Sequence, residues 1–284
     1  MAIVLESIST QALGSGVSTT ITKPTGLAVG DQMFAPIGSV FPVGGAGLLA
    51  APSGWTALFN ANYVNGFCTF TYGVFTKTAD AADVAASNFT FTHTTRGQHV
   101  GGAIARVSGY GIVDDSGFVS STAASPTAVA STITPTLANS LNLILTLAGD
   151  NVSAGSTVSF SNPAIATNNP TWTERLDSGI SNGSARYGIA VYTAPRTEAT
   201  AWGNITLTYV QNANAEIGAV ILNIAPRVDG THSVVTAPVY AVKQPFLRTG
   251  AISLTGTNPG TNSLNKTSWT NPDKPTTTWI NPNK

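Results

Sequence analysis

The three histidines are the first residues of this chain that could do chemistry. His93 and His99 flank Arg96-Gly97 in a stretch that we expect to form the tip of a β-hairpin, where the two imidazoles could approach each other. A zinc site requires three or four ligands. Neither a cysteine, an acidic residue nor the remaining His232 stands near this pair in the sequence. We therefore interpret these histidines as surface residues of a turn and predict no metal site.

Two groups of carboxylates are the next candidates. Asp80 and Asp83 lie close together in the sequence, and paired carboxylates can act as acid and base in glycoside hydrolysis. We favour a structural role for them, as solvated caps of a connection at the edge of the fold. Residues 77–87, around them, could form one short helical turn. Asp114-Asp115 and Asp150-Asn151 offer oxygen ligands for calcium, but no Asp-x-Asp-x-Asp-Gly loop contains them. Catalysis and calcium binding stay as alternatives to the structural interpretation.

Sequence motifs for nucleophilic or nucleotide chemistry are absent. The chain has no Gly-x-Ser-x-Gly turn, no phosphate-binding Gly-Lys-Ser/Thr loop and no dinucleotide-binding fingerprint. The only cysteine, Cys68, lies in an expected strand and excludes an intramolecular disulfide. We therefore predict no catalytic residue and no cofactor, and the chain is not expected to be an enzyme.

Composition and charge exclude further classes of function. Charged residues make up 9% of the 284 residues, against about 25% in an ordinary soluble domain, and the net charge is zero. Such a surface attracts neither nucleic acid nor an anionic membrane, so we expect neither as a partner. No apolar run of about 18 residues and no secretory signal is present, which favours synthesis in a cytoplasm. A neutral surface rich in Thr and Asn suits a protein in a tight assembly.

The elements that must position these residues follow an internal repeat. Pro52-Ser53-Gly54-Trp55-Thr56 is echoed by Asn169-Pro170-Thr171-Trp172-Thr173, 117 residues later. Val74-Phe75-Thr76 recurs as Val191-Tyr192-Thr193 at the same offset. A constant order of matching segments is what duplicated strands joined by variable loops produce.

Two further pairs of segments extend the repeat. Phe89-Thr90-Phe91-Thr92 recurs as Ile205-Thr206-Leu207-Thr208, and Gly102-Ala103-Ile104 as Gly218-Ala219-Val220, both at an offset of 116. Because both halves retain a tryptophan, we predict that Trp55 and Trp172 cap the core, each with its indole N–H bound to a carbonyl. A sugar-stacking platform is the alternative role for these two rings.

Short runs of Thr, Val, Ile, Phe and Tyr between Gly, Pro, Asn and Ser predict an all-β fold. Residues 16–113 and 127–226 repeat one order of strands, and 114–126 read as a linker. Each half is expected to form one sheet with one uncovered apolar face, so packing the halves together gives an antiparallel β-sandwich, a jelly roll. Two separate small sandwiches are the alternative. Residues 1–15 are expected to be an N-terminal strand or arm.

Long loops are where we expect a binding surface. The two largest predicted loops are 38–51 and 148–170, and by the repeat they occupy equivalent places.

Residues 227–284 differ in character from the rest of the chain. They are rich in Asn, Thr, Pro and Lys, and such a composition cannot bury enough apolar surface to fold alone. A short repeat ends this C-terminal arm, and we predict that it anchors the chain in pockets of a partner. A tail lying on its own sandwich is the alternative. The predicted partner-binding residues are Trp269, Asn271, Pro272, Lys274, Trp279, Asn281, Pro282 and Lys284.

At the Pro-Ser-Gly-Trp-Thr element the chain resembles a group of virion proteins of tailed bacteriophages. The residues that carry the resemblance are Val29-Gly30-Asp31, Pro52 to Thr56, Val74 to Lys77, Phe89 to Thr92 and Gly102 to Ala105. The terminal Trp-x-Asn-Pro-x-Lys repeat resembles short C-terminal segments of phage structural proteins. The second half departs from the pattern, since it has Asn169-Pro170-Thr171 and no lysine after Tyr192.

The resemblance covers residues 16–226 and the arm, and it implies a jelly roll made of two related halves. It also implies a non-enzymatic structural component of a phage virion, in the neck, tail, baseplate or a fibre. The expected partners are other virion proteins and copies of this chain, and the expected location is the virion after synthesis in the host cytoplasm. Two alternatives are a capsid decoration protein and a carbohydrate-binding module that attaches to a host surface glycan.

Overall fold

The computed structural model describes twelve segments of the chain, all in the first of its two units, Met1–Arg227. They are residues 3–9, 12–42, 47–64, 68–120, 127–130, 133–150, 159–161, 163–165, 170–181, 186–198, 205–208 and 216–226. The predicted C-terminal arm, with all eight of its partner-binding residues, lies outside them.

The described residues form sixteen antiparallel strands and one short helix, α1 (Ala81–Ala85), which confirms the all-β prediction. The strands of the first half are β1 (Val4–Ile8), β2 (Ala12–Thr22), β3 (Gln32–Pro42), β4 (Leu49–Ala50), β5 (Thr56–Val64), β6 (Cys68–Thr78), β7 (Asn88–Gly102) and β8 (Ala105–Ser108). Those of the second half are β9 (Tyr110–Ser120), β10 (Thr127–Ala130), β11 (Ser140–Asp150), β12 (Ala164–Ile165), β13 (Thr173–Ser181), β14 (Arg186–Arg196), β15 (Ile205–Thr208) and β16 (Glu216–Pro226).

The two halves have the same strand order. The central sheet of the first half runs β1-β8-β3-β6-β5, and that of the second runs β9-β16-β11-β14-β13, so each counterpart lies eight strands later. The outer strands correspond in the same way, with β7 pairing β2 and β4, and β15 pairing β10 and β12. This correspondence confirms that the sandwich is built from two related halves. The second half begins at β9, so residues 114–120, expected in a linker, belong to a strand that pairs with β16.

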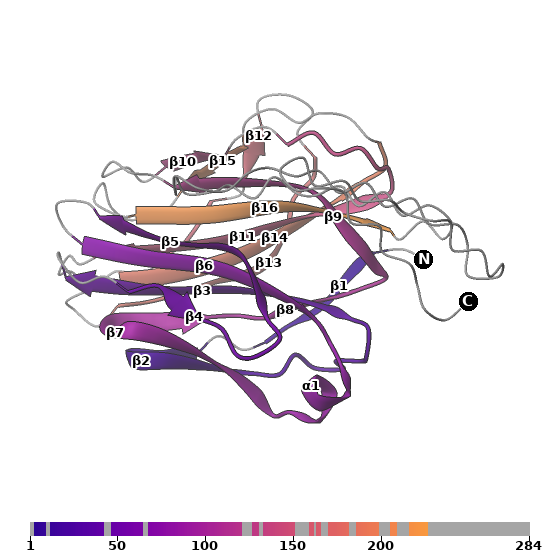
Figure 1. Ribbon diagram of the computed structural model, residues 1–284. Coiled ribbons are helices and arrows are strands. Elements are labelled where there is room, and N and C mark those ends of the chain that lie inside the picture. The colour runs from indigo at the N-terminus through magenta and orange to yellow at the C-terminus, as the bar shows by residue number, and fades with distance from the viewer. Residues whose placement is uncertain are drawn as a thin grey trace, which may run out of the picture. The chain divides into compact units, whose positions relative to one another are not determined.

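The strands stack in four layers, with the two central sheets in the middle and an outer layer on each side (Figure 1). Apolar side chains of both central sheets, including Phe34, Tyr72, Leu143 and Tyr187, form one core between the halves. Each half also has a second core, called its outer core, between its central sheet and its own outer strands. The expectation of a single uncovered apolar face per half was therefore incomplete, because both faces of each central sheet are covered.

The sequence of strand β11 does not alternate between apolar and polar residues, because both faces of the strand are buried. Leu143, Leu145 and Leu147 face the core between the halves, whereas Ile144 and Ala148 face the outer core of the second half. A strand that is buried on both faces needs apolar residues at successive positions.

The structure corrects one offset of the repeat. Val74 and its counterpart Val191 lie opposite Pro36 and Leu145, and in that frame Gly101 and Gly218 are the equivalent glycines, 117 residues apart. Ala103 and Val220 then both face the core between the halves, as equivalent residues must. The offset of 116 expected here was wrong by one residue, and a shift of one residue moves a side chain to the opposite face of a sheet.

Candidate functional site

The turn that carries the resemblance positions Trp55 over the outer core of the first half. Gly54 has a positive φ of 84°, and the Trp55 N–H donates to the Pro52 carbonyl at 3.3 Å. The indole then meets the rings of Phe89 and Phe91 edge-on, at centroid distances of 5.5 and 5.3 Å. Two of the matched segments thus meet in one aromatic cluster.

The counterpart Trp172 packs against the outer core of the second half. Each tryptophan therefore packs against the core between the central sheet and the outer strands of its own half. For Trp55 the expected hydrogen bond to a carbonyl is not found, since its buried Nε1 has no partner among the described residues.

The paired carboxylates Asp80 and Asp83 begin helix α1. Asp80 is its N-cap and accepts from the Asp83 N–H at 2.9 Å, while the Asp83 carboxylate accepts from the Asp80 N–H at 3.0 Å, a reciprocal capping box. Asp83 is buried and also forms an ion pair with Lys77 at 2.7 Å. Burial lowers the pKa of Lys77, but its bonds and charge interactions with Asp83 outweigh burial and raise that pKa. Hydrogen bonding from the Asp83 backbone lowers the pKa of Asp80.

The lysine of this ion pair lies against a second motif segment. A Cβ placed on Gly54 would lie 3.0 Å from Cε of Lys77, so the lysine side chain extends over the glycine of the Trp55 turn. The carboxylates thus cap a connection, as the structural interpretation expected, but Asp83 is buried rather than solvated.

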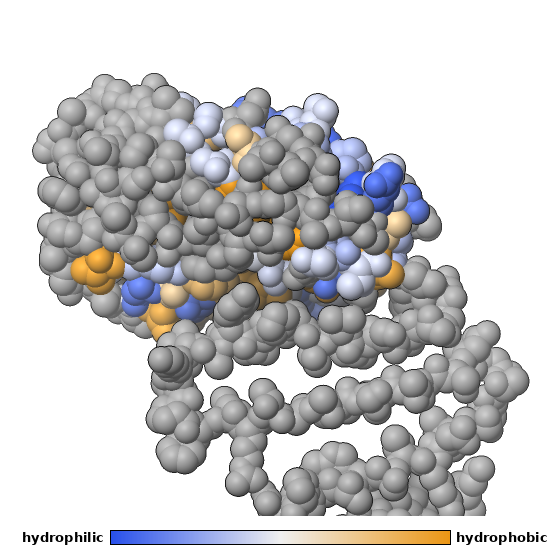
Figure 2. Space-filling view, turned by 90° about the horizontal axis from the view of Figure 1, so that it is seen from above, coloured by the Kyte–Doolittle hydropathy of each residue, from blue (hydrophilic) through white to orange (hydrophobic). Residues whose placement is uncertain are grey.

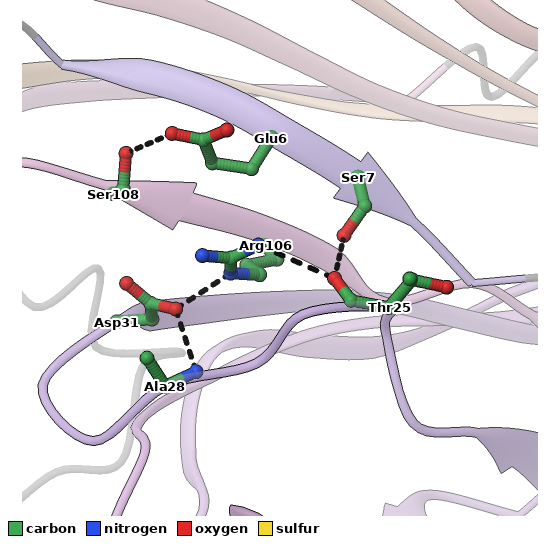
Figure 3. A network of polar contacts seen from close by, with 7 residues as sticks. All are labelled: Glu6, Ser7, Thr25, Ala28, Asp31, Arg106 and Ser108. Carbon is green, nitrogen blue, oxygen red and sulfur yellow. Dashed lines mark hydrogen bonds and ion pairs between the residues drawn. The ribbon is translucent and has the colours of Figure 1, made fainter.

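A polar network joins β1 and β8 to the loop before β3, at one end of the first central sheet (Figure 3). Arg106 Nε donates to Asp31 Oδ2 at 2.6 Å, and the Ala28 N–H donates to the same oxygen at 2.9 Å. The Thr25 carbonyl accepts from Arg106 Nη1 at 3.2 Å and from the Ser7 hydroxyl at 2.9 Å. These bonds fix the loop before β3 against the strands beside it.

The second half keeps this arrangement without charges. Gly30, with φ of 92°, corresponds to Asn139, with φ of 55°. Among the described residues, Asn139 is the only non-glycine residue with a positive φ. Ser140 then takes the place of Asp31, and Asn223 that of Arg106. Asn223 Nδ2 donates to the Ser140 hydroxyl at 2.8 Å. A neutral pair can replace the ion pair, which indicates that the network has a structural role.

Asp114, a candidate calcium ligand, is buried and bound by protein groups. Its carboxylate accepts from the Thr136 N–H and hydroxyl, both at 2.6 Å, and from the Leu137 N–H at 2.9 Å. Both of its oxygens therefore hold the connection that leads into β11. No group of three or more His, Cys, Asp or Glu side chains that could hold a metal ion occurs in the described part of the chain.

The histidines do not lie as the sequence suggested. Residues 88–102 form one long strand, β7, in which His93 pairs with Leu49 and His99 with Val40, so the expected hairpin tip is wrong. His93 is buried rather than on the surface, and its Nε2 lies 3.2 Å from the Thr19 hydroxyl. Burial lowers the pKa of His93 to about 4, so the ring is neutral at pH 7. His232 lies outside the described residues.

The predicted binding loops are shorter than expected, because β3 extends to Pro42 and β11 to Asp150. Within them, β4 pairs with β7 and β12 pairs with β15. The residues equivalent to β4 in register are Phe160-Ser161, just before β12. The Asn60 side chain on β5 binds β4 as a neighbouring strand would: its Nδ2 donates to the Leu49 carbonyl at 2.8 Å, and its Oδ1 accepts from the Leu49 N–H at 3.3 Å.

The counterpart of Asn60 is Asp177, whose Oδ2 accepts from the Phe160 N–H at 3.1 Å. Burial raises the pKa of Asp177. Sequence reasoning missed both residues, although their equal offset from Trp55 and Trp172 marks them as equivalent.

Comparisons with known proteins return nothing: no family model matches the chain, and no curated protein or solved structure matches it at a significant level. Within the described segments, no helix has the length and apolar character required to cross a membrane. The fold and its polar clusters define a duplicated all-β sandwich in which the motif residues maintain the scaffold.

Proposed function

We propose that this chain is a non-enzymatic structural component of a tailed-phage virion, a building block of the neck, tail, baseplate or a fibre. The observation that carries the proposal is the role of the residues behind the resemblance. Gly54, Trp55, Lys77, Asp31 and Phe89 all make contacts that hold loops and outer strands to a central sheet. A motif that maintains a rigid scaffold is what a building block requires.

The shared core between the halves supports the same proposal. Large side chains of both central sheets pack into one core, so the halves cannot move apart without exposing it. On this proposal, the rigid sandwich supplies the body of the subunit and residues 227–284 supply the contacts with other virion proteins.

Deletion of residues 260–284 tests the role of the arm. We expect the truncated protein to keep the circular dichroism spectrum and melting temperature of the full chain but to be missing from purified particles. A narrower variant, Trp269→Ala with Trp279→Ala, should have the same effect, whereas Thr276→Ala with Thr277→Ala serves as a matched control in the same arm. Normal incorporation of the truncated protein would contradict the proposed role of the arm.

The location in the particle is tested separately. Labelling the protein in purified particles and imaging them should place it at the neck, tail, baseplate or a fibre, with tens of copies or fewer. Hundreds of copies on the shell would favour a capsid decoration protein. Absence from particles combined with binding to host surface polysaccharide would favour the carbohydrate-binding alternative.

A further inference from the structure

Exposed apolar residues of the described surface are concentrated near strand β5. Six large apolar residues are exposed in the described segments, and Leu48, Leu58 and Val64 are three of them. Leu58 and Val64 lie on β5, and Leu48 precedes the Leu49 that Asn60 of β5 holds. Figure 2 shows hydrophobic areas (orange) beside hydrophilic ones (blue) in the coloured part of one face.

The second half carries polar residues at the same three positions. The counterparts of Leu58 and Val64 on β13 are Arg175 and Ser181, and that of Leu48 is Ser159. Both edge strands even share a bulge, between Ala57 and Phe59 and between Glu174 and Leu176. Because the two halves have one topology, the fold does not require apolar side chains here.

Strand β5 lies at the edge of its sheet and pairs only with β6 among the described strands. Native proteins shield edge strands with charged residues, since an uncharged edge can pair with another chain. Strand β13 follows this rule with Glu174, Arg175 and Asp177, whereas β5 carries no charged residue in its nine positions. Of these two equivalent edge strands, β5 is therefore the one suited to pairing.

The sequence of β5 identifies the partner that fits it. Residues 58–64 read Leu-Phe-Asn-Ala-Asn-Tyr-Val, so an aliphatic residue, an aromatic residue and an asparagine precede Ala61 and follow it in reverse order. Residues 59–64 also pair one-to-one with β6, which leaves the segment regular apart from the bulge at Leu58.

We propose that two copies of this chain pair through β5, antiparallel about a two-fold axis at Ala61, and form one continuous sheet. In this register Leu58 lies opposite Val64 of the second copy, and Phe59 lies opposite Tyr63 of the second copy. Each residue meets one of like chemistry, and no charges oppose each other. A two-fold interface must be self-complementary in this way. The same register on β13 would bring Arg175 opposite Ser181 and Asp177 opposite Gly179.

The first test replaces two apolar residues of β5 by the residue types that β13 carries at the equivalent positions. Sedimentation of the full chain over a micromolar concentration range should show a dimer. In the double variant Leu58→Arg with Val64→Ser, each substitution occurs twice in the interface, so we expect the dimer dissociation constant to rise at least about 100-fold. Val29→Ser is the matched control, because Val29 is 67% exposed but lies in the turn before β3. It should leave the dissociation constant unchanged.

A cysteine on the two-fold axis provides the second test. Directly opposed residues of an antiparallel pair have Cα atoms about 4.5–5.5 Å apart, within the range of a disulfide. The variant Ala61→Cys should therefore form a covalent dimer under mild oxidation, since the native thiol of Cys68 is buried. Ser178→Cys places a thiol at the equivalent, half-buried position of β13 and should not do so.

These outcomes decide the proposal without reference to a virion. A monomer over the whole concentration range would overturn it, as would a dimer that the double variant leaves intact. Equal yields of covalent dimer from Ala61→Cys and Ser178→Cys would do the same. Circular dichroism and melting curves of the variants show that each is folded.

Discussion

Removal of the Tyr72 hydroxyl tests how the two halves are joined. Tyr72 lies in β6 of the first half, and its hydroxyl donates to the Leu145 carbonyl of the second half at 2.6 Å. Tyr187 of the second half reciprocates, with its hydroxyl donating to the Gly101 carbonyl at 2.9 Å. Both side chains are fully buried, so each bond is made where water cannot replace it.

The expected cost of Tyr72→Phe follows from this burial. An unsatisfied buried group costs about 1–3 kcal/mol. The Leu145 carbonyl lies in the centre of a sheet and has a second lone pair, so we expect the lower part of that range, about 1–2 kcal/mol. For a domain of this size the melting temperature should fall by about 2–8 °C.

Urea and thermal unfolding of the full chain measure this effect. Tyr192→Phe is the control, because among the described residues the Tyr192 hydroxyl makes only a long bond of 3.4 Å, to the Ser161 carbonyl of the same half. We expect that variant to lose less than about 0.5 kcal/mol. The reasoning would be refuted if Tyr72→Phe melted within 1 °C of the native chain, or if Tyr192→Phe lost more stability than Tyr72→Phe.

A second measurement on the same residues uses alkaline pH. Burial raises the pKa values of Tyr72 and Tyr187 well above the ordinary value of 10.0. The unfolded chain therefore releases these protons at a lower pH than the folded chain. The free energy of unfolding should be constant from about pH 7 to about pH 10 and fall above it. The double variant Tyr72→Phe with Tyr187→Phe should weaken this decline.

Three further predictions concern single positions. Gly218→Ala should lower the free energy of unfolding by about 1–3 kcal/mol, since a Cβ there would lie 2.6 Å from Cδ1 of Tyr72. Gly30→Asn should be near neutral, because Asn139 holds the equivalent turn, and urea unfolding compares the two variants. Because burial lowers the pKa of His93 to about 4, the unfolded chain binds a proton below pH 6.5 that the folded chain does not. The free energy of unfolding should therefore fall between pH 6.5 and 4, on the order of 2 kcal/mol, and a flat profile in His93→Gln would show that this residue is the cause. Asp83→Asn removes the ion pair with Lys77 and should cost about 1–2 kcal/mol in thermal unfolding, while an unchanged melting temperature would show that the pair contributes nothing.

The internal repeat was predictable because it depends on local patterns. The Trp-Thr element, preceded by a proline in both halves, and the Thr-rich strands recur at nearly constant offsets, and both reflect the preferences of short segments. The short helix at Ala81–Ala85 was predictable for the same reason, since its capping residues, Asp80 before it and Asp83 within it, are local in the chain.

Register and burial were less predictable, because they depend on strands that are distant in the sequence. The Gly102 segment was matched to Gly218 by residue type alone, and only the ladder of β11 with β16 showed that Gly101 is the counterpart. His93 was expected on the surface, since Arg96-Gly97 was interpreted as the tip of a hairpin. Its burial follows from the pairing of β7 with β4, which no local pattern reveals.

The sequence by itself determined the secondary structure class, the duplication and the positions of Trp55 and Trp172 in it. Local propensity and the period of apolar residues act over a few residues, so they can be read directly from the chain. Tertiary structure alone decided the four-layer stack, the core shared by the halves and the tyrosine bonds across it. Tyr72 and Leu145 are 73 residues apart, and Tyr187 and Gly101 are 86 apart. Contacts over such separations exist only once both halves have folded, because the strands of one half form the surface on which the other packs.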